Sequence, residues 1–379
     1  MAVQRVRMFL FFLLVIILGI RVLVEYKKPI LQPIKDKDYT CLGTVIEEPE
    51  YRDTTLRLVV ECGGFRMLAT VDRFTVVEYL DTVSVKGVVS PAKFKGYNDY
   101  YINFAKVEVV SHGSSLVKSL FKLKHSFLSN LKNVLGEPHA SLAGGLVVGE
   151  KSALGKELLD DFRHAGLIHI VVLSGFNITV IADGLMRVLG FLPQTLRISV
   201  GATGMILFSF LVGGGATVIR STVMALIMLL SKIAGRQYVA LQGLFIAGVA
   251  MGIYEPKTIL YDASFHLSFL ATLAMILLAP RIEKRLTFLP ERFEFRGIIS
   301  STIATQIFVS PYLIYLMGSI SFWGLVTNIF VLPVIPPTML FVFLSGVTGW
   351  ASHWLSFALA IPAHMLLSYE LFVVKLFSI

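Results

Sequence analysis

Charged residues are scarce in this chain. They make up 16% of its 379 residues, whereas hydrophobic residues make up 55%. Ordinary soluble domains carry about 25% charged residues, so the deficit excludes a disordered chain, a collagen-like chain and a typical cytosolic enzyme. The composition is typical of a polytopic membrane protein, and we expect much of the net charge of +9 to be a topology signal.

Motifs of soluble enzymes are also missing. The sequence has no GxxxxGK[ST] loop, so nothing in it suggests ATP hydrolysis. It has no HExxH pair, no histidine cluster with metal-ligand spacing and no GxSxG around a serine. We therefore predict no metal, no cofactor and no catalytic residue.

Cysteine is nearly absent, with only Cys41 and Cys62 present. Two cysteines alone cannot make a zinc site. They are either two buried thiols or a disulfide, and a disulfide requires that both lie outside the cytoplasm. If their strands pair as a hairpin, the two residues come near each other across it.

The first hydrophobic segment covers residues 8–20, and Arg5 and Arg7 precede it. A cleaved signal peptide is the rival interpretation, but no A-x-A-like site follows. We predict a membrane anchor over residues 1–25 with its N-terminus in the cytoplasm, which places the following residues outside.

Residues 36–112 have a different character, with short alternating stretches separated by turn signals. Leu56, Leu58, Val60 and Cys62 share one face at period two. Five short strands in about 75 residues predict a small extracytoplasmic barrel of the OB-fold kind.

One part of this β domain offers lysines beside tyrosines, whose rings could bind a ligand by stacking. The alternative is a sheet edge with ordinary tyrosine packing. The residues are Lys93, Lys95, Tyr97, Tyr100 and Tyr101.

Residues 115–135 predict an amphipathic helix, because leucine, phenylalanine and valine recur every three or four residues. Lys118, Lys122 and Lys124 occupy other positions. The helix lies in the membrane interface or forms a basic lip for an anionic ligand such as DNA. The alternative is a helix packed on the barrel with solvated lysines.

Hydrophobic segments dominate from residue 138 onward, and we predict a polytopic transmembrane domain of about seven or eight spans over 138–379. Basic residues fall in alternate connections, which agrees with a cytoplasmic N-terminus. The spans are expected at about 166–192, 196–213, 216–234, 237–254, 263–280, 297–317, 325–349 and 351–374.

Polar groups inside a membrane are functional candidates because they are expensive there. If residues 166–192 form one helix, His169, Ser174 and Asn177 share a polar sector. Arg220 lies about one turn into its span, and a guanidinium binds phosphate bidentately. The alternatives are bonds to neighbouring helices for the first group and a snorkelling side chain for Arg220.

Two further groups lie in later spans. Asp262 and His266 are four residues apart, so the carboxylate could orient the imidazole or pair with Arg220, while a helix N-cap is the alternative for Asp262. Gln306 lies in a polar stripe with Thr302 and Ser310, and Asn328 begins the next run. Such stripes either join helices or line an aqueous path.

Four blocks of the sequence, over about residues 139–340, resemble the ComEC family of DNA-uptake (competence) membrane proteins. They begin with GLVVGEKSAL and DDFRHAGLIHIVVLSGFNITVIA, and end with QIFVSPYLIYLMGSISFWGLVTNIFVLPVIPP. The matching positions include Gly149, Glu150, Phe162, Gly166, His169, Ser174, Gly175, Arg220, Arg236, Asp262, Phe265, Leu267, Ser268, Phe269, Gln306, Pro311, Gly318, Ser321, Asn328 and Pro333.

The sequence departs from the family pattern in two ways. The family often has histidine where Asn177 stands and glutamine where His266 stands, which argues against a strict proton relay there. Many members also end in a metallo-β-lactamase-like domain, whose HxHxDH motif this chain lacks. We expect any such nuclease to be a separate protein.

The resemblance implies a channel, rather than an enzyme, that passes single-stranded DNA across the bacterial plasma membrane during natural transformation. The expected partners are single-stranded DNA, membrane lipids, a DNA receptor, a separate nuclease and a cytoplasmic motor ATPase. The alternatives are a transporter of another anionic polymer, an intramembrane Ser/His hydrolase using Ser174 and His266, and a scaffold without a path.

Overall fold

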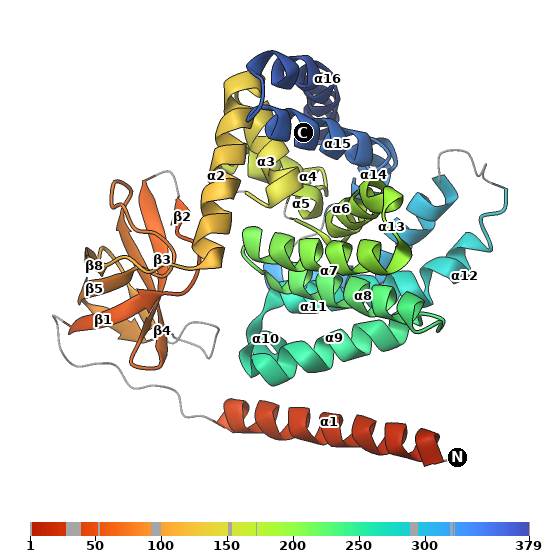
Figure 1. Cartoon of the computed structure of the whole chain (residues 1–379), viewed down its shortest axis with the longest axis horizontal. Coiled ribbons are helices and arrows are strands. Elements are labelled where there is room, and N and C mark those ends of the chain that lie inside the picture. Colours follow the sequence, from red (N-terminus) through yellow and green to blue (C-terminus); the bar gives the residue numbers. More distant parts are fainter. Residues whose placement is uncertain are drawn as a thin grey trace. The chain divides into compact units, whose positions relative to one another are not determined.

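A computed structural model describes residues 2–27, 39–51, 54–91, 100–150, 154–171, 173–288, 295–318, 321 and 323–378. The chain divides into two compact units (Figure 1). The first unit contains Met1–Ser119 and Phe245–Phe265, and the second contains Leu120–Leu244 and His266–Ile379. Lys93, Lys95 and Tyr97 lie outside the described residues.

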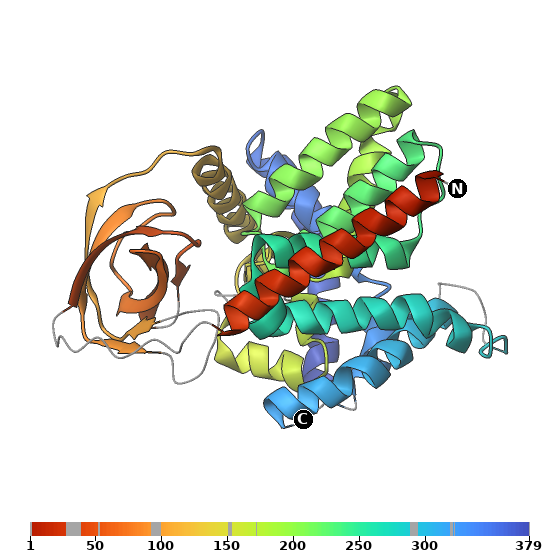
Figure 2. The ribbon, with the colours of Figure 1, turned by 90° about the horizontal axis from the view of Figure 1, so that it is seen from below.

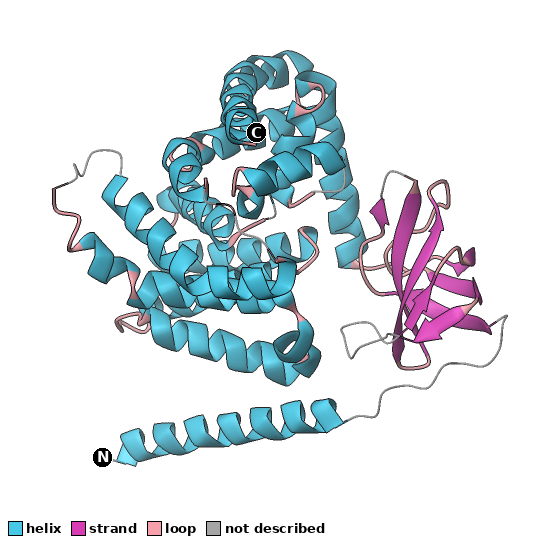
Figure 3. Cartoon of the chain, turned by 180° about the vertical axis from the view of Figure 1, so that it is seen from behind, coloured by secondary structure: helices cyan, strands magenta, loops and turns pink. Residues whose placement is uncertain are grey.

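The β domain of the first unit is one curled sheet, drawn in magenta in Figure 3. Its order is β6-β7-β4-β3-β1-β5-β8, with β2 paired to β3. The strands are β1 (Tyr39–Val45), β2 (Glu50–Tyr51), β3 (Thr55–Cys62), β4 (Phe65–Asp72), β5 (Thr82–Gly87), β6 (Val89–Pro91), β7 (Tyr100–Ile102) and β8 (Lys106–Ser111).

The sheet curls back on itself because β7 and β8 belong to one stretch of chain. β7 pairs in parallel with β4, and β8 pairs antiparallel with β5. This stretch therefore connects the two sides of the sheet, and Figure 2 shows the resulting curl. Alternate residues of β3 are buried, as the period-two pattern predicts, so the predicted small OB-like β domain is confirmed.

A disulfide joins Cys41 and Cys62, whose Cα atoms are 6.2 Å apart. β1 and β3 are antiparallel, with Thr44 opposite Glu61. This pairing brings the two cysteines together, as the hairpin argument predicts. The disulfide alternative therefore holds over free thiols.

The predicted anchor segment forms helix α1 (Ala2–Lys27). In the same unit, α1 contacts the short helix α10 (Pro256–Tyr261). The Arg66 Nη2 atom of β4 lies 2.7 Å from the Glu255 Oε2 atom that precedes α10. This ion pair links the β domain to the chain segment between α9 (Ala240–Tyr254) and α10.

The second unit is almost entirely helical (Figure 3). Its elements are α2 (Leu116–Leu135), which begins in the first unit, α3 (His139–Val148), α4 (Lys156–His164), α5 (Ile168–Val171), α6 (Gly175–Val188), η2 (Leu189–Phe191), α7 (Gln194–Leu211), α8 (Ala216–Ile233), α11 (Ala263–Leu277), which also crosses from the first unit, α12 (Ala279–Glu283), α13 (Phe295–Met317), α14 (Gly324–Val331), α15 (Ile335–Thr348) and α16 (His353–Phe377).

Within the described residues, five helical segments are long and apolar enough to cross a membrane. They are Gln194–Leu211, Ala216–Ile233, Ala263–Glu283, Phe295–Leu316 and His353–Phe377. A sixth results if α14 and α15, which are bent by 53° at their break, count as one span. The predicted class, a polytopic helical membrane protein with a small β domain, is confirmed.

The largest apolar core of the second unit lies among α2, α3, α15 and α16. Phe127 of α2 packs 6.3 Å from Phe343 of α15, between ring centroids. Two buried serines join α15 to α16, since Ser345 Oγ donates to the Ser356 carbonyl at 3.0 Å and Ser356 Oγ donates to the Ser345 carbonyl at 2.8 Å. The apolar face of α2 therefore packs against protein.

Candidate functional site

The segment 166–192 is not one helix, so the prediction of a single polar sector is wrong. α5 ends at Val171 and α6 begins at Gly175. Ser174 lies between them with an extended backbone, and its Oγ accepts a hydrogen bond from the Asn177 N–H at 3.4 Å. A serine in this position caps the helix that follows it, which explains the break.

Asn177 is fully buried and uses its whole amide. Its Nδ2 donates to the carbonyls of Leu146 at 3.1 Å and Ile170 at 3.2 Å, and its Oδ1 accepts from Ser174 Oγ at 3.0 Å. Asn177 therefore braces α6 against α3 and α5. His169, by contrast, is exposed on α5.

Arg220 is a cationic side chain that is buried inside the helical bundle. It sits in the second turn of α8, is 6% exposed and is held by neutral groups. Its Nε donates to Ser268 Oγ of α11 at 2.7 Å, and its Nη2 donates to Ser221 Oγ at 3.0 Å. A third contact joins Nη1 to the Met224 sulfur at 3.3 Å.

The guanidinium also lies against the first residue of α6. A Cβ atom added to Gly175 would be 2.5 Å from Arg220 Nη2. The N-terminus of a helix carries a partial positive charge and free backbone N–H groups, which favour anions. Ion pairs occur at several places in the described chain, but none of them includes Arg220.

A buried cation beside a positive helix end is costly unless an anion compensates it. The arrangement of Arg220, Ser221, Ser268 and the start of α6 therefore has the character of an anion site. We call these residues, with Gly175, the Arg220 site. The Arg220 site brings together Gly175, Arg220 and Ser268, which belong to three different blocks of the sequence that resemble the family.

Asp262 and His266 do not act on each other as the sequence suggested. Asp262 Oδ1 accepts from the backbone N–H of Ser264 at 2.8 Å and of Phe265 at 3.4 Å, so it caps α11. His266 Nδ1 instead forms a hydrogen bond of 2.6 Å with Tyr312 Oη. The N-cap alternative for Asp262 is the one observed.

The polar stripe of α13 contacts α14. Asn328 Nδ2 lies 3.4 Å from Thr302 Oγ1, and both residues are buried. Gln306 Nε2 would be 3.2 Å from a Cβ atom on Gly324, so this amide packs on α14. Asn328 Oδ1 is buried without a hydrogen-bond partner in the described chain.

The start of α14 crosses the loop after α4 at very short range. Gly166 has a φ of +74°, and a Cβ atom on it would be 2.6 Å from the Gly324 Cα. Thr327 Oγ1 donates to the Ala165 carbonyl at 2.8 Å, and Ser321 Oγ donates to the His164 carbonyl. Gly166 therefore has a structural reason for its place in the first block.

Tyr100 and Tyr101, the two described tyrosines of the predicted basic and aromatic cluster, differ in exposure. Tyr100 is buried and its ring lies edge-on to Phe65, with centroids 5.7 Å apart. Tyr101 is 38% exposed. Of these two, only Tyr101 offers a ring face to a ligand.

Of the three α2 lysines singled out in the sequence, Lys118, Lys122 and Lys124, two form ion pairs. Lys118 Nζ lies 2.9 Å from Asp81 Oδ1 and 2.8 Å from Glu78 Oε2. Lys124 Nζ lies 3.0 Å from Glu150 Oε2. Lys122 is exposed, so it is the lysine of this group placed to meet a solvent-borne ligand.

The surroundings of Lys118 and Asp81 shift the pKa values of both side chains. Burial opposes the charge on Asp81, but hydrogen bonds from the Glu78 backbone, Lys118 and His112 hold the pKa of its carboxyl below the usual value. Burial also opposes the charge on Lys118, yet its bonds to Glu78 and Asp81 raise its pKa. The pair therefore stays charged at neutral pH.

Sequence reasoning missed Glu370 of α16, which is 2% exposed. Its Oε1 lies 2.7 Å from Thr338 Oγ1. Glu370 falls inside a predicted span, so the rule that ionisable groups in membranes are candidates could have found it. His139 and His364 were also missed; their rings stack with centroids 4.0 Å apart.

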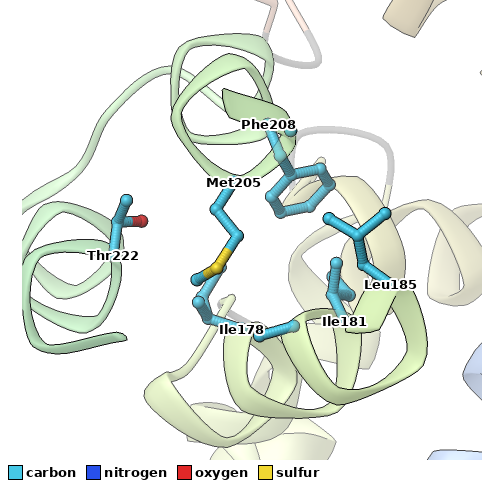
Figure 4. A pocket seen from close by; sticks show the side chains of 8 residues that line it. Ile178, Ile181, Leu185, Met205, Phe208 and Thr222 are labelled. Carbon is cyan, nitrogen blue, oxygen red and sulfur yellow. The ribbon is translucent and has the colours of Figure 1, made fainter. Parts of the chain in front are cut away.

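A small cavity of about 20 Å³ lies among α6, α7 and α8 (Figure 4). Ile178, Ile181 and Leu185 of α6 line it together with Met205 and Phe208 of α7. Its lining is apolar apart from Thr222, so a single hydroxyl is the polar group that it offers to a ligand.

The described geometry defines a class, a polytopic helical membrane protein whose bundle buries an arginine among neutral groups. The model of the competence protein family matches residues 146–379. This match covers more than half of the chain, and the chain belongs to the competence protein family. The resemblance noted in the sequence is confirmed.

Two curated relatives are similar to the chain. An uncharacterized protein of Aquifex aeolicus (strain VF5) is 29% identical over 236 residues, which cover 59% of this chain and 56% of that protein. ComE operon protein 3 of Bacillus subtilis (strain 168) is 19% identical over 262 residues, which cover 66% of this chain and 34% of that protein. The chain thus spans about half the length, or less, of these relatives. No solved structure matches it significantly.

Proposed function

We propose that the chain forms a path for single-stranded DNA across the bacterial plasma membrane during natural transformation. Membership of the competence protein family supports DNA uptake. The observation that carries the proposal is Arg220, a buried guanidinium bonded to neutral groups beside the positive end of α6. A phosphodiester supplies the single negative charge that this site requires.

The site is organised to hold the guanidinium while leaving its charge available. Ser268 binds Nε and Ser221 binds Nη2, so both ends of the planar group are fixed. Because hydroxyls carry no net charge, they orient Arg220 without neutralising it. A phosphate of the DNA then exchanges its bound cation for Arg220. Because the other groups around Arg220 are neutral, they do not hold the phosphate, and it can dissociate.

The chain is oriented with its N-terminus in the cytoplasm and its β domain outside. The basic residues before the first apolar segment favour this topology. The disulfide between Cys41 and Cys62 agrees with it, because disulfides persist on the oxidising side of a membrane. The exposed Tyr101 and Lys122 would then meet DNA before it enters the bundle.

Transport fits the site better than catalysis does. An intramembrane hydrolase would need Ser174 and His266 together, but Ser174 bonds Asn177 and His266 bonds Tyr312. A motor ATPase, a DNA receptor and a separate nuclease are the proposed partners. A second anionic polymer, such as a lipid-linked glycan phosphate, would satisfy the same guanidinium.

Binding of labelled single-stranded DNA to the full chain in lipid nanodiscs tests the proposal. Arg220→Ala should weaken binding about tenfold or more, since one charge-assisted hydrogen bond contributes roughly 1.5–3 kcal/mol. Lys232→Ala is the matched control, because it removes one positive charge from an exposed position at the other end of α8.

The proposal fails if the two variants bind DNA equally well. It also fails if single-stranded DNA does not bind at low salt while a glycan phosphate does, which would favour the other polymer. Stronger binding of duplex than of single strands would contradict the proposed strand selectivity.

A further inference from the structure

Glu370 is a carboxyl group enclosed by the helices of the second unit. Its Oε1 lies 2.7 Å from Thr338 Oγ1 of α15. The same hydroxyl lies 2.9 Å from the carbonyl oxygen of Val334. Thr338 itself is fully buried and Glu370 is 2% exposed, so only the edge of the carboxyl group meets the surface.

The number of hydrogens available to these oxygens favours a protonated Glu370. A threonine hydroxyl has one hydrogen to donate and can accept others. Both neighbours of Thr338 Oγ1 are oxygens, and the Val334 carbonyl can only accept. All contacts are satisfied if Thr338 donates to Val334 while a protonated Glu370 donates to Thr338. An ionised Glu370 would instead compete with Val334 for the single hydrogen.

Within the described part of the helices packed against α16, no buried charge stabilises an ionised Glu370. α14 and α15 carry no titratable residue, and α3 contributes only His139, which bonds Ser368 at 2.8 Å. Asp161 of α4 is half-buried, and the other ionisable residues of α4 are exposed: Lys156, Glu157, Asp160, Arg163 and His164. On α16 itself, His353, His364, Tyr369 and Lys375 are also exposed.

The hydroxyl that Glu370 contacts lies beside the bend between α14 and α15. Val334 is the N-cap residue of α15, and its carbonyl also accepts the Thr338 N–H at 3.0 Å. If Glu370 releases its proton to water, Thr338 must turn its hydrogen from Val334 to Glu370 Oε1. The carbonyl at the bend then loses one of its two hydrogen bonds.

We infer that Glu370 is a proton-binding site inside the bundle, and that its proton controls the hydrogen bonds at the α14–α15 bend. The ligand is a single proton, and one proton leaves for each rearrangement of Thr338. The inference concerns this proton alone, so it stands or falls independently of the proposed DNA path.

Infrared difference spectroscopy of the full chain in nanodiscs tests the protonation directly. The carbonyl stretch of a protonated carboxyl should be present at neutral pH and lost in Glu370→Gln. Thr338→Val should shift this band to higher frequency because the carboxyl loses its acceptor, whereas Thr338→Ser should leave it unchanged. Glu150→Gln is the control, since Glu150 is paired with Lys124 at 3.0 Å.

The coupling to the bend has its own reporter. Trp323 caps α14, and its ring lies 5.2 Å from the ring of Phe377 on α16. With Trp350 and Trp354 replaced by phenylalanine, Trp323 emission should change with pH in the otherwise native chain and lose this change in Glu370→Gln. A carboxylate band that disappears in Glu370→Gln would overturn the proton site. Equal pH dependence of the emission in both proteins would overturn the coupling.

Discussion

Replacing Gly175 by alanine should displace Arg220 without changing any charge. The added Cβ would be 2.5 Å from Arg220 Nη2, whereas ordinary van der Waals contact begins at 3.4 Å. The guanidinium must therefore retreat by about 0.9 Å. Gly175 does not have a positive φ, so alanine fits the backbone and the effect comes from the contact alone.

The displacement is large compared with the tolerance of the hydrogen bonds that hold Arg220. Its Nε lies 2.7 Å from Ser268 Oγ, and a shift of this size along that direction lengthens the contact beyond a normal hydrogen bond. Loss of one charge-assisted bond costs about 1.5–3 kcal/mol. We expect the affinity for single-stranded DNA to fall roughly tenfold to a hundredfold.

The assay is DNA binding in nanodiscs, with Gly184→Ala as the matched control. Gly184 lies in the same helix, α6, and a Cβ atom there meets nothing within 4 Å. This control should bind DNA normally and gain up to about 1 kcal/mol of helix stability. Native affinity in a well-folded Gly175→Ala protein would refute the assignment of the Arg220 site to DNA.

Three further predictions concern stability. Replacing Cys41 and Cys62 by serine should destabilise the β domain by about 3 kcal/mol, because the disulfide closes a loop of 21 residues; equal rates of proteolysis with and without the bond would contradict this. The ionised Asp81 stabilises the native protein, and this stabilisation is lost as the pH falls through the lowered pKa of its carboxyl. In Asp81→Asn, this pH-dependent loss of stability should be absent. Unchanged acid unfolding in Asp81→Asn would argue against the ion pair with Lys118. Asn177→Leu should lower the thermal stability of the full chain by about 1–3 kcal/mol, and a native melting temperature would show that its two carbonyl contacts contribute little.

The β domain could be predicted from the sequence because the alternation of buried and outward residues is visible within each strand. Leu56, Leu58 and Val60 alternate with outward residues, and this alternation alone assigns them to one buried face. The same pattern brought Cys41 and Cys62 close together on paired strands, but the choice between free thiols and a disulfide required the structure. The parallel pairing of β4 with β7 did not follow, because it joins strands distant in the chain.

The break before α6 was missed for a different reason. A hydropathy pattern averages over about 19 residues, so it passes over Ser174, although a serine before glycine is a local cap signal. The sequence named Arg220 as a candidate phosphate contact, but it could not predict the neighbours of this side chain. Those neighbours depend on which residues α11 and α6 bring to it, and the sequence left a pairing with Asp262 open.

The ion pairs of α2 also could not be predicted, because their partners are distant in the sequence. Lys118 and Lys124 look like solvated residues of an amphipathic helix, yet Asp81 and Glu150 lie 37 and 26 positions away in the chain and neutralise them. Such pairings are set by packing. Glu370 was visible as a charged residue within an apolar run, but its bond to Thr338 required the structure.

Entry of labelled DNA into proteoliposomes that contain the purified chain tests the central claim most directly. Single-stranded and duplex DNA are offered under an imposed proton gradient, with the Arg220→Ala and Lys232→Ala variants in parallel. The account predicts nuclease-protected single strands inside vesicles with the native chain or Lys232→Ala, and at least tenfold fewer with Arg220→Ala. Equal entry through the native and Arg220→Ala proteins, or entry of duplex DNA alone, would contradict it.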